Sequence, residues 1–287
     1  MSAPAVVCLG GGHGAAAALS AARRYGRSVS AVISVADDGG SSGRLRELFD
    51  LVAVGDLRRC LVALAADPED AAALFEHRFS SGELAGHPVG NLLLAGLIEG
   101  CGDLLEALRR AGAMLGCCGQ VLPATVEPVV LRARGSAGEV VGQSAIAQSS
   151  GIEAISLDPA DPAVPAEVLS AIAAADQVLL GPGSLYTSVL AAAAPPAITD
   201  AIAATSATRI YLANLRPQVP ETTGYSVADH LGALERHGIA IDVVLCDPSW
   251  GIEVGTSSPR VQIAQLTAGE QPLHDPAALA AVLSALA

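Results

Sequence analysis

Residues 4–46 read PAVVCLGGGHGAAAALSAARRYGRSVSAVISVADDGGSSGRLR. An apolar run meets a glycine-rich turn at 10–14, and an alanine-rich helical pattern follows to about Tyr25. A second apolar run covers 29–35 and ends in a polar segment, 36–46, that we expect to be a loop. The succession of strand, glycine turn, helix, strand and polar loop predicts one βαβ unit.

The glycine turn is suited to an anion. Glycines let backbone N–H groups approach a ligand without a Cβ in the way, and the N-terminus of the following helix favours negative charge. The spacing Gly10-x-Gly12-x-x-Ala15 also matches a loose dinucleotide fingerprint. Asp37 and Asp38 follow the second strand, where a carboxylate can hold a ribose hydroxyl. This pattern predicts phosphate or nucleotide binding, although such turns also occur for packing reasons.

Composition narrows the possible functions. The chain has 287 residues, of which 51% are hydrophobic and 3% aromatic, and its net charge is −13. It contains no Lys, which excludes a Schiff-base lysine and a P-loop lysine. The acidic balance argues against binding to nucleic acid or to an anionic membrane surface. The cysteines lack the C-x-x-C spacing of zinc and redox sites.

The hydropathy pattern indicates a protein of the cytoplasm. No apolar stretch reaches about 18 residues without Gly, Pro or charge, so no membrane span is expected. The first strand pattern begins near the N-terminus, so no signal peptide is expected.

A second polar segment follows near residue 55. Gly55 precedes Asp56, which is either the N-cap of a helix to about Ala65 or a ligand residue. Arg58 lies in the first turn of that helix, where the dipole disfavours a cation. This position suits an arginine that faces a phosphate, and it also suits a solvated one.

The segment 86–91 leads into an apolar helix that we expect at 92–98. Asn91 at its start either caps this helix or faces a ligand. His87 precedes a proline, and a structural role in the loop is favoured for it over the role of a base.

Another glycine loop follows a strand pattern that ends at Leu180. Gly181-Pro182-Gly183-Ser184 places backbone N–H groups and hydroxyls at a helix N-terminus, where Ser184 is a good N-cap. The segment lacks a G-x-S-x-G elbow, so Ser184 is not interpreted as a hydrolase nucleophile. Because the two glycine loops would lie at the carboxyl edge of one sheet, that edge is the predicted ligand site.

The whole pattern predicts an α/β protein with a Rossmann-like three-layer fold around a mostly parallel sheet, in a single domain of residues 1–287. Strand-like segments at 126–132 and 139–141 predict a small β-hairpin inserted near 121–142. A long polar loop, 214–225, follows a further strand and is expected to form a wall or lid of the site.

These motifs resemble the YvcK-like branch of the CofD family, whose members are called gluconeogenesis factors. The match runs along nearly the whole chain, at 10–14, 36–46, 55–58, 87–94, 180–188 and 214–225. The resemblance implies a Rossmann-like fold with a small added substructure, and a ligand site built from the strand-end loops. It implies that nucleotide or another ligand is bound by Gly10, Gly11, Gly12, His13, Gly14, Asp37, Asp38, Ser41, Ser42, Arg44, Asp56, Arg58, Asn91, Gly181, Gly183, Ser184, Tyr186, Thr187, Asn214, Gln218, Glu221 and Thr222.

The sequence departs from the family pattern in three places. His13 stands where Thr is usual, and Gln143 stands where Glu is usual. In the loop 214–225, Arg216-Pro217 and Val219-Pro220 replace the usual residues. We therefore expect altered phosphate contacts at His13 and an altered conformation of the loop.

Three functions remain open from the sequence. The resemblance to YvcK-like members implies a regulator of central carbon metabolism and of cell shape and cell-wall morphogenesis that binds a nucleotide or UDP-sugar. The resemblance to other CofD members implies a transferase that moves a phospholactyl-like group from a nucleotide diphosphate carrier, with Mg²⁺ held by Asp37, Asp38 or Asp56. The Rossmann-like pattern alone is compatible with an NAD-linked oxidoreductase, for which no proton-donor constellation is evident. No catalytic residue is predicted. A homo-oligomer is expected, and protein partners in cell-wall synthesis are implied by the resemblance.

Overall fold

The computed structural model describes residues 3–136, 138–250, 260–267 and 273–287. The first βαβ unit forms as predicted: strand β1 (Ala5–Gly10) leads into helix α1 (Gly12–Ala22), and strand β2 (Ser28–Ile33) lies parallel to β1. Every residue of β1 is buried, because helices cover both faces of the sheet at this point.

Seven parallel strands form the main sheet of the described chain, in the order β10-β9-β8-β7-β1-β2-β3. The strands not yet given are β3 (Gln120–Pro123), β7 (Gln177–Leu180), β8 (Thr208–Leu212), β9 (Val243–Cys246) and β10 (Arg260–Ile263). From β1 the chain builds the sheet first toward β3 and later, from β7, in the other direction. The order therefore reverses between β1 and β7, and open α/β sheets bind ligands at the carboxyl ends of strands at such a point.

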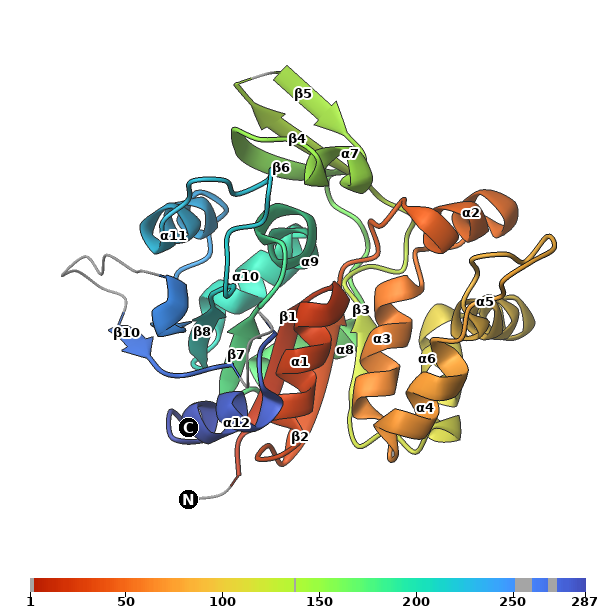
Figure 1. Ribbon diagram of the computed structural model, residues 1–287, viewed down its shortest axis with the longest axis horizontal. Coiled ribbons are helices and arrows are strands. Elements are labelled where there is room, and N and C mark those ends of the chain that lie inside the picture. Colours follow the sequence, from red (N-terminus) through yellow and green to blue (C-terminus); the bar gives the residue numbers. More distant parts are fainter. Residues whose placement is uncertain (1–2, 137, 251–259, 268–272) are drawn as a thin grey trace.

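Helices form a layer on each face of this sheet. Besides α1, these layers contain α3 (Gly55–Leu64), α8 (Ala166–Ala173), α9 (Ala191–Ala193), α10 (Pro196–Ala204) and α12 (Pro276–Ser284). On one face α1 packs against α3 and α12, and on the other face α9 packs on β1 beside α10 and α8 (Figure 1). The predicted three-layer α/β fold is confirmed.

The remaining helices lie at the sides of this core. They include α4 (Pro68–Phe75) and α5 (Val89–Cys101) beside α3, α6 (Leu104–Met114) against α5 and the edge strand β3, and α11 (Val227–Arg236) beside the small sheet. A π-helical segment, Leu185–Leu190, leads into α9, and a short 3-10 turn, Pro248–Trp250, follows β9.

A small antiparallel sheet lies above the carboxyl ends of the main sheet (Figure 1). Its strands are β4 (Val130–Gly135), β5 (Gly138–Val141) and β6 (Ile152–Asp158), in the order β5-β4-β6, with helix α7 (Gln143–Ala147) between β5 and β6. The predicted hairpin is present as β4 and β5. The insertion differs in extent from the predicted range near 121–142. The start of that range belongs to β3, which pairs with β2 in the main sheet, and β6 adds a third strand beyond its end.

The segment 36–46 is not the loop that we expected, because helix α2 (Gly40–Phe49) begins inside it. The Asp37 carboxylate accepts a hydrogen bond of 3.0 Å from the Gly39 N–H, and the Gly43 N–H donates to the Gly39 carbonyl at 3.0 Å. These bonds close the first turn of α2. The prediction was wrong because glycine- and serine-rich segments have low intrinsic helix propensity, which tertiary contacts overcome here.

The two predicted glycine loops pack directly against each other. An ideal Cβ on Gly14 would lie 2.0 Å from the Pro182 carbonyl oxygen. The side-chain amide of Asn214 secures the second loop, since it accepts from the Gly183 N–H at 2.8 Å and donates to the Gly183 carbonyl at 2.7 Å. Both loops are therefore fixed at the carboxyl edge of the sheet.

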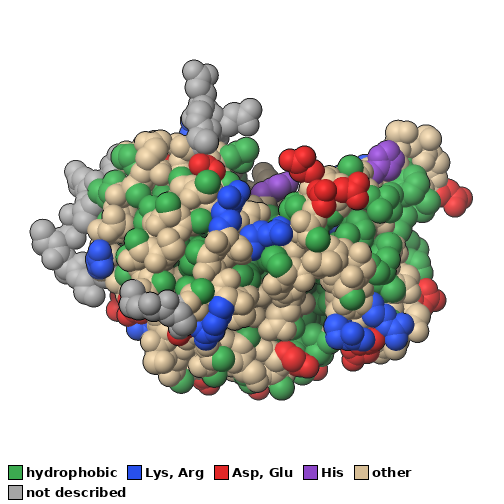
Figure 2. Space-filling model, turned by 90° about the horizontal axis from the view of Figure 1, so that it is seen from below, with side chains coloured by type: hydrophobic (Ala, Val, Ile, Leu, Met, Phe, Trp, Pro, Cys, Tyr) green, Lys and Arg blue, Asp and Glu red, His purple; other side chains and the backbone are tan. Residues whose placement is uncertain are grey.

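The surface opposite the small sheet carries basic and acidic side chains in small groups among hydrophobic and neutral polar ones (Figure 2).

In the part of the chain that the structure describes, no single helix is long and apolar enough to cross a membrane. One pair of consecutive helical segments, Leu185–Ala193 and Pro196–Ala204, reaches that length and hydropathy when taken together, but the pair is bent by 78°.

We expect Gly14→Ala to lower the free energy of unfolding by about 1–3 kcal/mol, because the new methyl group would overpack the contact with Pro182. The matched control is Gly96→Ala on the exposed side of α5, where an ideal Cβ meets nothing within 4 Å. This control should gain up to about 1 kcal/mol from helix propensity. Denaturant unfolding of both variants measures the difference, and a Gly14→Ala variant as stable as the control would contradict the close packing of the two loops.

Candidate functional site

The first glycine loop presents the N-terminus of α1 without a side-chain cap. Gly11 is the N-cap residue and Gly12 has φ +63°, in the left-handed region that glycine favours, with open space where its Cβ would be. The N–H groups of the first turn therefore have no side-chain acceptor, and an anion can satisfy them. An ideal Cβ on Gly11 would lie 2.5 Å from Asp56 Oδ2, so this loop also approaches the start of α3 closely.

The second glycine loop is held by a buried carboxylate. Glu221 accepts hydrogen bonds from the Ser184 hydroxyl, from the Tyr186 N–H at 2.9 Å and from the Thr187 hydroxyl at 3.3 Å. Ser184 accepts from the Thr187 N–H at 3.1 Å, so its predicted role as an N-cap is confirmed. Burial raises the pKa of Glu221 despite these donors. Glu221 thus ties the loop 214–225 to the Gly-Pro-Gly-Ser turn.

A cavity of about 500 Å³ lies between these loops. It is lined by residues predicted from three separate segments, namely Gly11, His13, Gly14, Gly183, Ser184, Thr187, Gln218 and Glu221. Ser188 and Val219 also line it and were not predicted. Backbone N–H groups and hydroxyls therefore surround one space at the point where the strand order reverses.

A second cavity, of about 280 Å³, lies at the starts of α2 and α3. Six predicted residues line it, namely Asp37, Ser41, Ser42, Asp56, Arg58 and Asn91. Arg59 and Arg78 line it as well. Arg59 has the same signal as Arg58, a cation in the first turn of a helix, although it is not among the predicted site residues, whereas Arg78 has no sequence signal that separates it from other arginines. Gln143 lines both cavities, so the two cavities are neighbours on either side of the start of α7.

Asp37 and Asp56 face the second cavity together. Burial raises the pKa of Asp37, and the nearby negative charge of Asp56 adds to this effect. Asp56 is not the N-cap of α3, which is Val54. The Asp56 carboxylate accepts instead from Arg59 Nη1 at 2.7 Å. The N-cap interpretation of Asp56 was therefore wrong.

Asp38 lies away from this pair. Its Oδ1 accepts from the Ser144 N–H at 2.9 Å, and it lines a different cavity beside Arg46 and Glu47. Asp38 therefore fixes α7 to the start of α2. Within the described ranges no group of three or more His, Cys, Asp or Glu side chains could hold a metal ion. Two carboxylates, Asp37 and Asp56, are nevertheless sufficient for Mg²⁺ when phosphate oxygens and water complete its shell.

Arg58 is buried, with 1% of its side chain exposed. It donates to Glu76 at 2.8 Å and to Asn91 Oδ1 at 2.7 Å. Its stem passes over Gly90, where an ideal Cβ would lie 2.7 Å from Arg58 Cδ. The guanidinium is thus engaged by protein groups, and Asn91 bonds to Arg58 and Ser41 rather than capping α5, whose N-cap is Pro88.

The other predicted residues lie outside the linings of both cavities. They are Gly10, Gly12, Asp38, Arg44, Gly181, Tyr186, Asn214 and Thr222. The Tyr186 hydroxyl donates to the Ile152 carbonyl at 2.8 Å in the interior, and Arg44 donates to the Ala85 carbonyl at 3.0 Å. Asn214 and Thr222 hold the loops in place instead. Asn214 accepts from the Gly183 N–H, and the Thr222 hydroxyl accepts from the Gln218 N–H at 2.8 Å.

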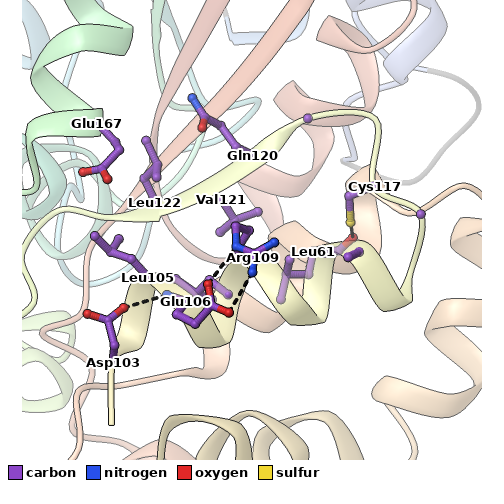
Figure 3. A pocket seen from close by; sticks show the side chains of 15 residues that line it. Leu61, Asp103, Leu105, Glu106, Arg109, Cys117, Gln120, Val121, Leu122 and Glu167 are labelled. Atoms are coloured by element: carbon purple, nitrogen blue, oxygen red, sulfur yellow. Dashed lines mark hydrogen bonds and ion pairs between the residues drawn. The ribbon is translucent and has the colours of Figure 1, made fainter. Parts of the chain in front are cut away.

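A larger cavity of about 560 Å³ lies elsewhere, between α6 and the edge strand β3 (Figure 3). None of the predicted residues line it. Among its charged groups, Glu106 accepts from Arg109 at 2.7 Å, and Asp103 caps α6 by accepting from the Glu106 backbone N–H. Size alone does not make it the functional site.

Comparison with known proteins shows what the chain is similar to. The model of the family described as 2-phospho-L-lactate transferase CofD matches residues 6–260. A Mycobacterium tuberculosis protein named "Putative gluconeogenesis factor" is 42% identical over 306 residues, which cover 97% of this chain and 89% of the relative. A Halalkalibacterium halodurans protein named "Gluconeogenesis factor" is 40% identical over 84% of this chain and 76% of its own. The crystal structure of a UPF0052 family protein from Bacillus halodurans superposes with a TM-score of 0.90 at 33% identity, over 99% of both chains.

The raised pKa of Asp37 predicts a pH-dependent effect of Asp37→Asn. The folded state holds this proton more tightly than the unfolded chain, so the stabilisation is present at low pH and is lost as pH rises through the pKa of folded Asp37. The variant cannot ionise, so it should become more stable than the wild type on going from about pH 4 to pH 7, by on the order of 1 kcal/mol. Melting temperatures across this range measure the effect.

The neighbouring variant Asp38→Asn serves as the control. It should lose stability at pH 7, because an amide oxygen accepts from the Ser144 N–H more weakly than a carboxylate does. If Asp37→Asn also lost stability at pH 7, the burial of a repelled carboxylate at this position would be contradicted.

Proposed function

Since the chain belongs to the CofD family, we propose that it is a gluconeogenesis factor like the relatives named above, which binds a nucleotide or UDP-sugar in the two joined cavities. The proposal includes its location in the cytoplasm and a regulatory role in central carbon metabolism and in cell shape and cell-wall morphogenesis. A homo-oligomeric state and protein partners in cell-wall synthesis belong to the same proposal.

The observation that carries this proposal is the convergence of the two glycine loops. The uncapped N-terminus of α1 and the hydroxyls of Ser184, Thr187 and Ser188 surround one cavity at the reversal of strand order. Backbone N–H groups at a helix N-terminus suit the diphosphate of a nucleotide. The Ser184 and Thr187 hydroxyls donate to Glu221, so the Ser188 hydroxyl is the side-chain donor proposed for the ligand on this wall. His13 lies at this cavity and is exposed, so its imidazole can replace the usual hydroxyl as a phosphate contact.

The second cavity suits the remaining polar part of such a ligand. Asp37 supplies acceptors and Ser42 supplies a hydroxyl, which are the groups that bind ribose or sugar hydroxyls. The two cavity volumes, about 500 and 280 Å³, together fall within the range of about 300–1,000 Å³ typical of small-molecule sites. Gln143 lies where a ligand would pass from one cavity to the other.

A second candidate function is a CofD-type transfer of a phospholactyl-like group. The observation that favours it is the carboxylate pair Asp37 and Asp56 beside Arg59 in the second cavity. These two carboxylates would hold Mg²⁺, which supplies charge neutralisation for a diphosphate leaving group. Arg59 and Arg78 would bind the anionic oxygens of the same ligand.

Isothermal titration with UDP-GlcNAc, UDP-glucose, GDP and NAD tests the proposed ligand class. We expect a UDP-sugar to bind and to be recovered chemically unchanged. Gly12→Val should weaken its binding at least tenfold, because a β-branched residue opposes the left-handed backbone (φ +63°) that shapes the N-terminus of α1. Ser184→Ala should weaken binding of the same ligand by removing a hydroxyl from the cavity wall. The control is Ser149→Ala, because the Ser149 hydroxyl donates to the Ala145 carbonyl on the surface. This variant should bind the UDP-sugar with wild-type affinity. Loss of different ligands in the two site variants would refute a single shared site.

The transferase candidate predicts a dependence on metal. If Asp37 and Asp56 hold Mg²⁺, EDTA and Asp56→Asn should each weaken binding of GDP by about tenfold or more, and EDTA should have no further effect on the variant. If neither change weakened the binding of GDP, the transferase function would be contradicted. That result would not bear on the proposed binding of a UDP-sugar.

A further inference from the structure

A chain of hydrogen bonds runs from the wall of the second cavity into the protein interior. Ser41 Oγ lies 2.8 Å from His87 Nδ1 and accepts from Asn91 Nδ2 at 3.0 Å. Asn91 Oδ1 accepts in turn from Arg58 Nη1 at 2.7 Å. Ser41 and Asn91 line the cavity, whereas His87 is buried behind them with 4% exposure.

The donors and acceptors in this chain have a defined direction. Arg58 can only donate, so the carbonyl oxygen of Asn91 must face it and the Asn91 amide N–H groups must face Ser41. Ser41 Oγ therefore accepts from Asn91, and its own proton is available to His87 Nδ1. Burial and the positive charges of Arg44 and Arg78 lower the pKa of His87, which keeps the imidazole neutral and able to accept that proton.

The cavity also has groups that can hold a phosphoryl group next to Ser41. Arg59 and Arg78 line it, and Arg59 Nε is buried without a hydrogen-bond partner among the described residues. A neutral base behind a hydroxyl, with cationic donors in front of it, is the arrangement of an activated nucleophile. Ser184, in the other cavity, has no comparable base, because its acceptor Glu221 also accepts from the Tyr186 N–H and the Thr187 hydroxyl.

We propose that Ser41 is a nucleophile that accepts a phosphoryl group from a nucleoside polyphosphate, with His87 as its general base. In this step Ser41 Oγ forms a bond to the terminal phosphorus, and the phosphoanhydride P–O bond breaks. The electron pair of that bond leaves with the shortened nucleotide. The Ser41 proton passes to His87 Nδ1 and from there to solvent. This covalent modification goes beyond the proposed binding function, which requires no chemistry at Ser41.

Diisopropyl fluorophosphate tests this nucleophile without any nucleotide. Attack by Ser41 forms the same Oγ–P bond and releases fluoride, so the wild-type protein should gain one adduct, which peptide mass spectrometry should locate on Ser41. Ser41→Ala should gain none. His87→Asn keeps a polar group near the position of Nδ1 but removes the base, so its labelling rate constant should fall by about a hundredfold. Ser149→Ala should react at the wild-type rate.

The result for the wild-type protein decides the proposal even if a variant fails to fold. Absence of an adduct, or an adduct on another serine, would overturn it, and so would a folded His87→Asn variant that reacts as fast as the wild type. A second measurement incubates the wild-type protein with ATP, GTP and UTP, and one added phosphoryl group on Ser41 is expected with at least one of them. Failure of UDP-sugar binding in the titrations would leave the fluorophosphate result unchanged, so the two proposals are tested separately.

Discussion

The close approach of the two glycine loops is the constraint on which the candidate site depends. Strands β1 and β7 pair in parallel up to Leu9 and Leu180, and the loops that follow them meet where Gly14 lies directly against the Pro182 carbonyl. The backbone N–H groups of both loops therefore face a common cavity instead of two separate surfaces. Asn214 and Glu221 hold the second loop from the far side through the bonds described above. Asn214, which does not line the cavity, and Glu221, which does, thus determine where the backbone donors of the second loop lie.

A second constraint comes from the buried charge of Arg58. An arginine this far from water requires charged and polar partners, since an unpaired buried charge costs several kcal/mol. Its partners, Glu76 and Asn91, come from the end of α4 and from α5, and Asn91 continues to Ser41 on α2. One ionic network therefore connects four helices around the smaller cavity. Arg58 can only donate, so it determines which way Asn91 is oriented and therefore that Asn91 donates to Ser41. The direction of the Ser41 proton thus follows from Arg58, although Arg58 does not bond to Ser41.

Sequence patterns predicted the fold well because its strands are short apolar runs buried on both faces, separated by glycine turns and helical periods. The same reasoning failed at 36–46, where helix α2 is held by tertiary bonds of Ser41 to His87 and of Arg46 to the Val129 carbonyl that no local propensity reveals. For the site, the resemblance gave the loops but not the direction of each side chain. Asp37 and Asp38 are adjacent in sequence, yet only Asp37 faces the cavity, since Asp38 holds α7. Arg78 was missed because its role depends on tertiary position alone, whereas Arg59 shares the first-turn position that made Arg58 a candidate.

The net charge of −13 also limits how this protein can attract an anionic ligand. The long-range field of the chain opposes the approach of a nucleotide, but in physiological salt it is screened over about 8 Å. Attraction must therefore come from short range, and the two cavities provide it through helix N-termini, neutral hydroxyls and the arginines Arg59 and Arg78. Asp37 and Asp56 oppose that attraction unless a cation or a proton neutralises them. The 280 Å³ cavity, with its two facing carboxylates, is thus the part of the site whose preference for a ligand should change most with metal. In the 500 Å³ cavity the carboxylate of Glu221 is already engaged by three protein donors.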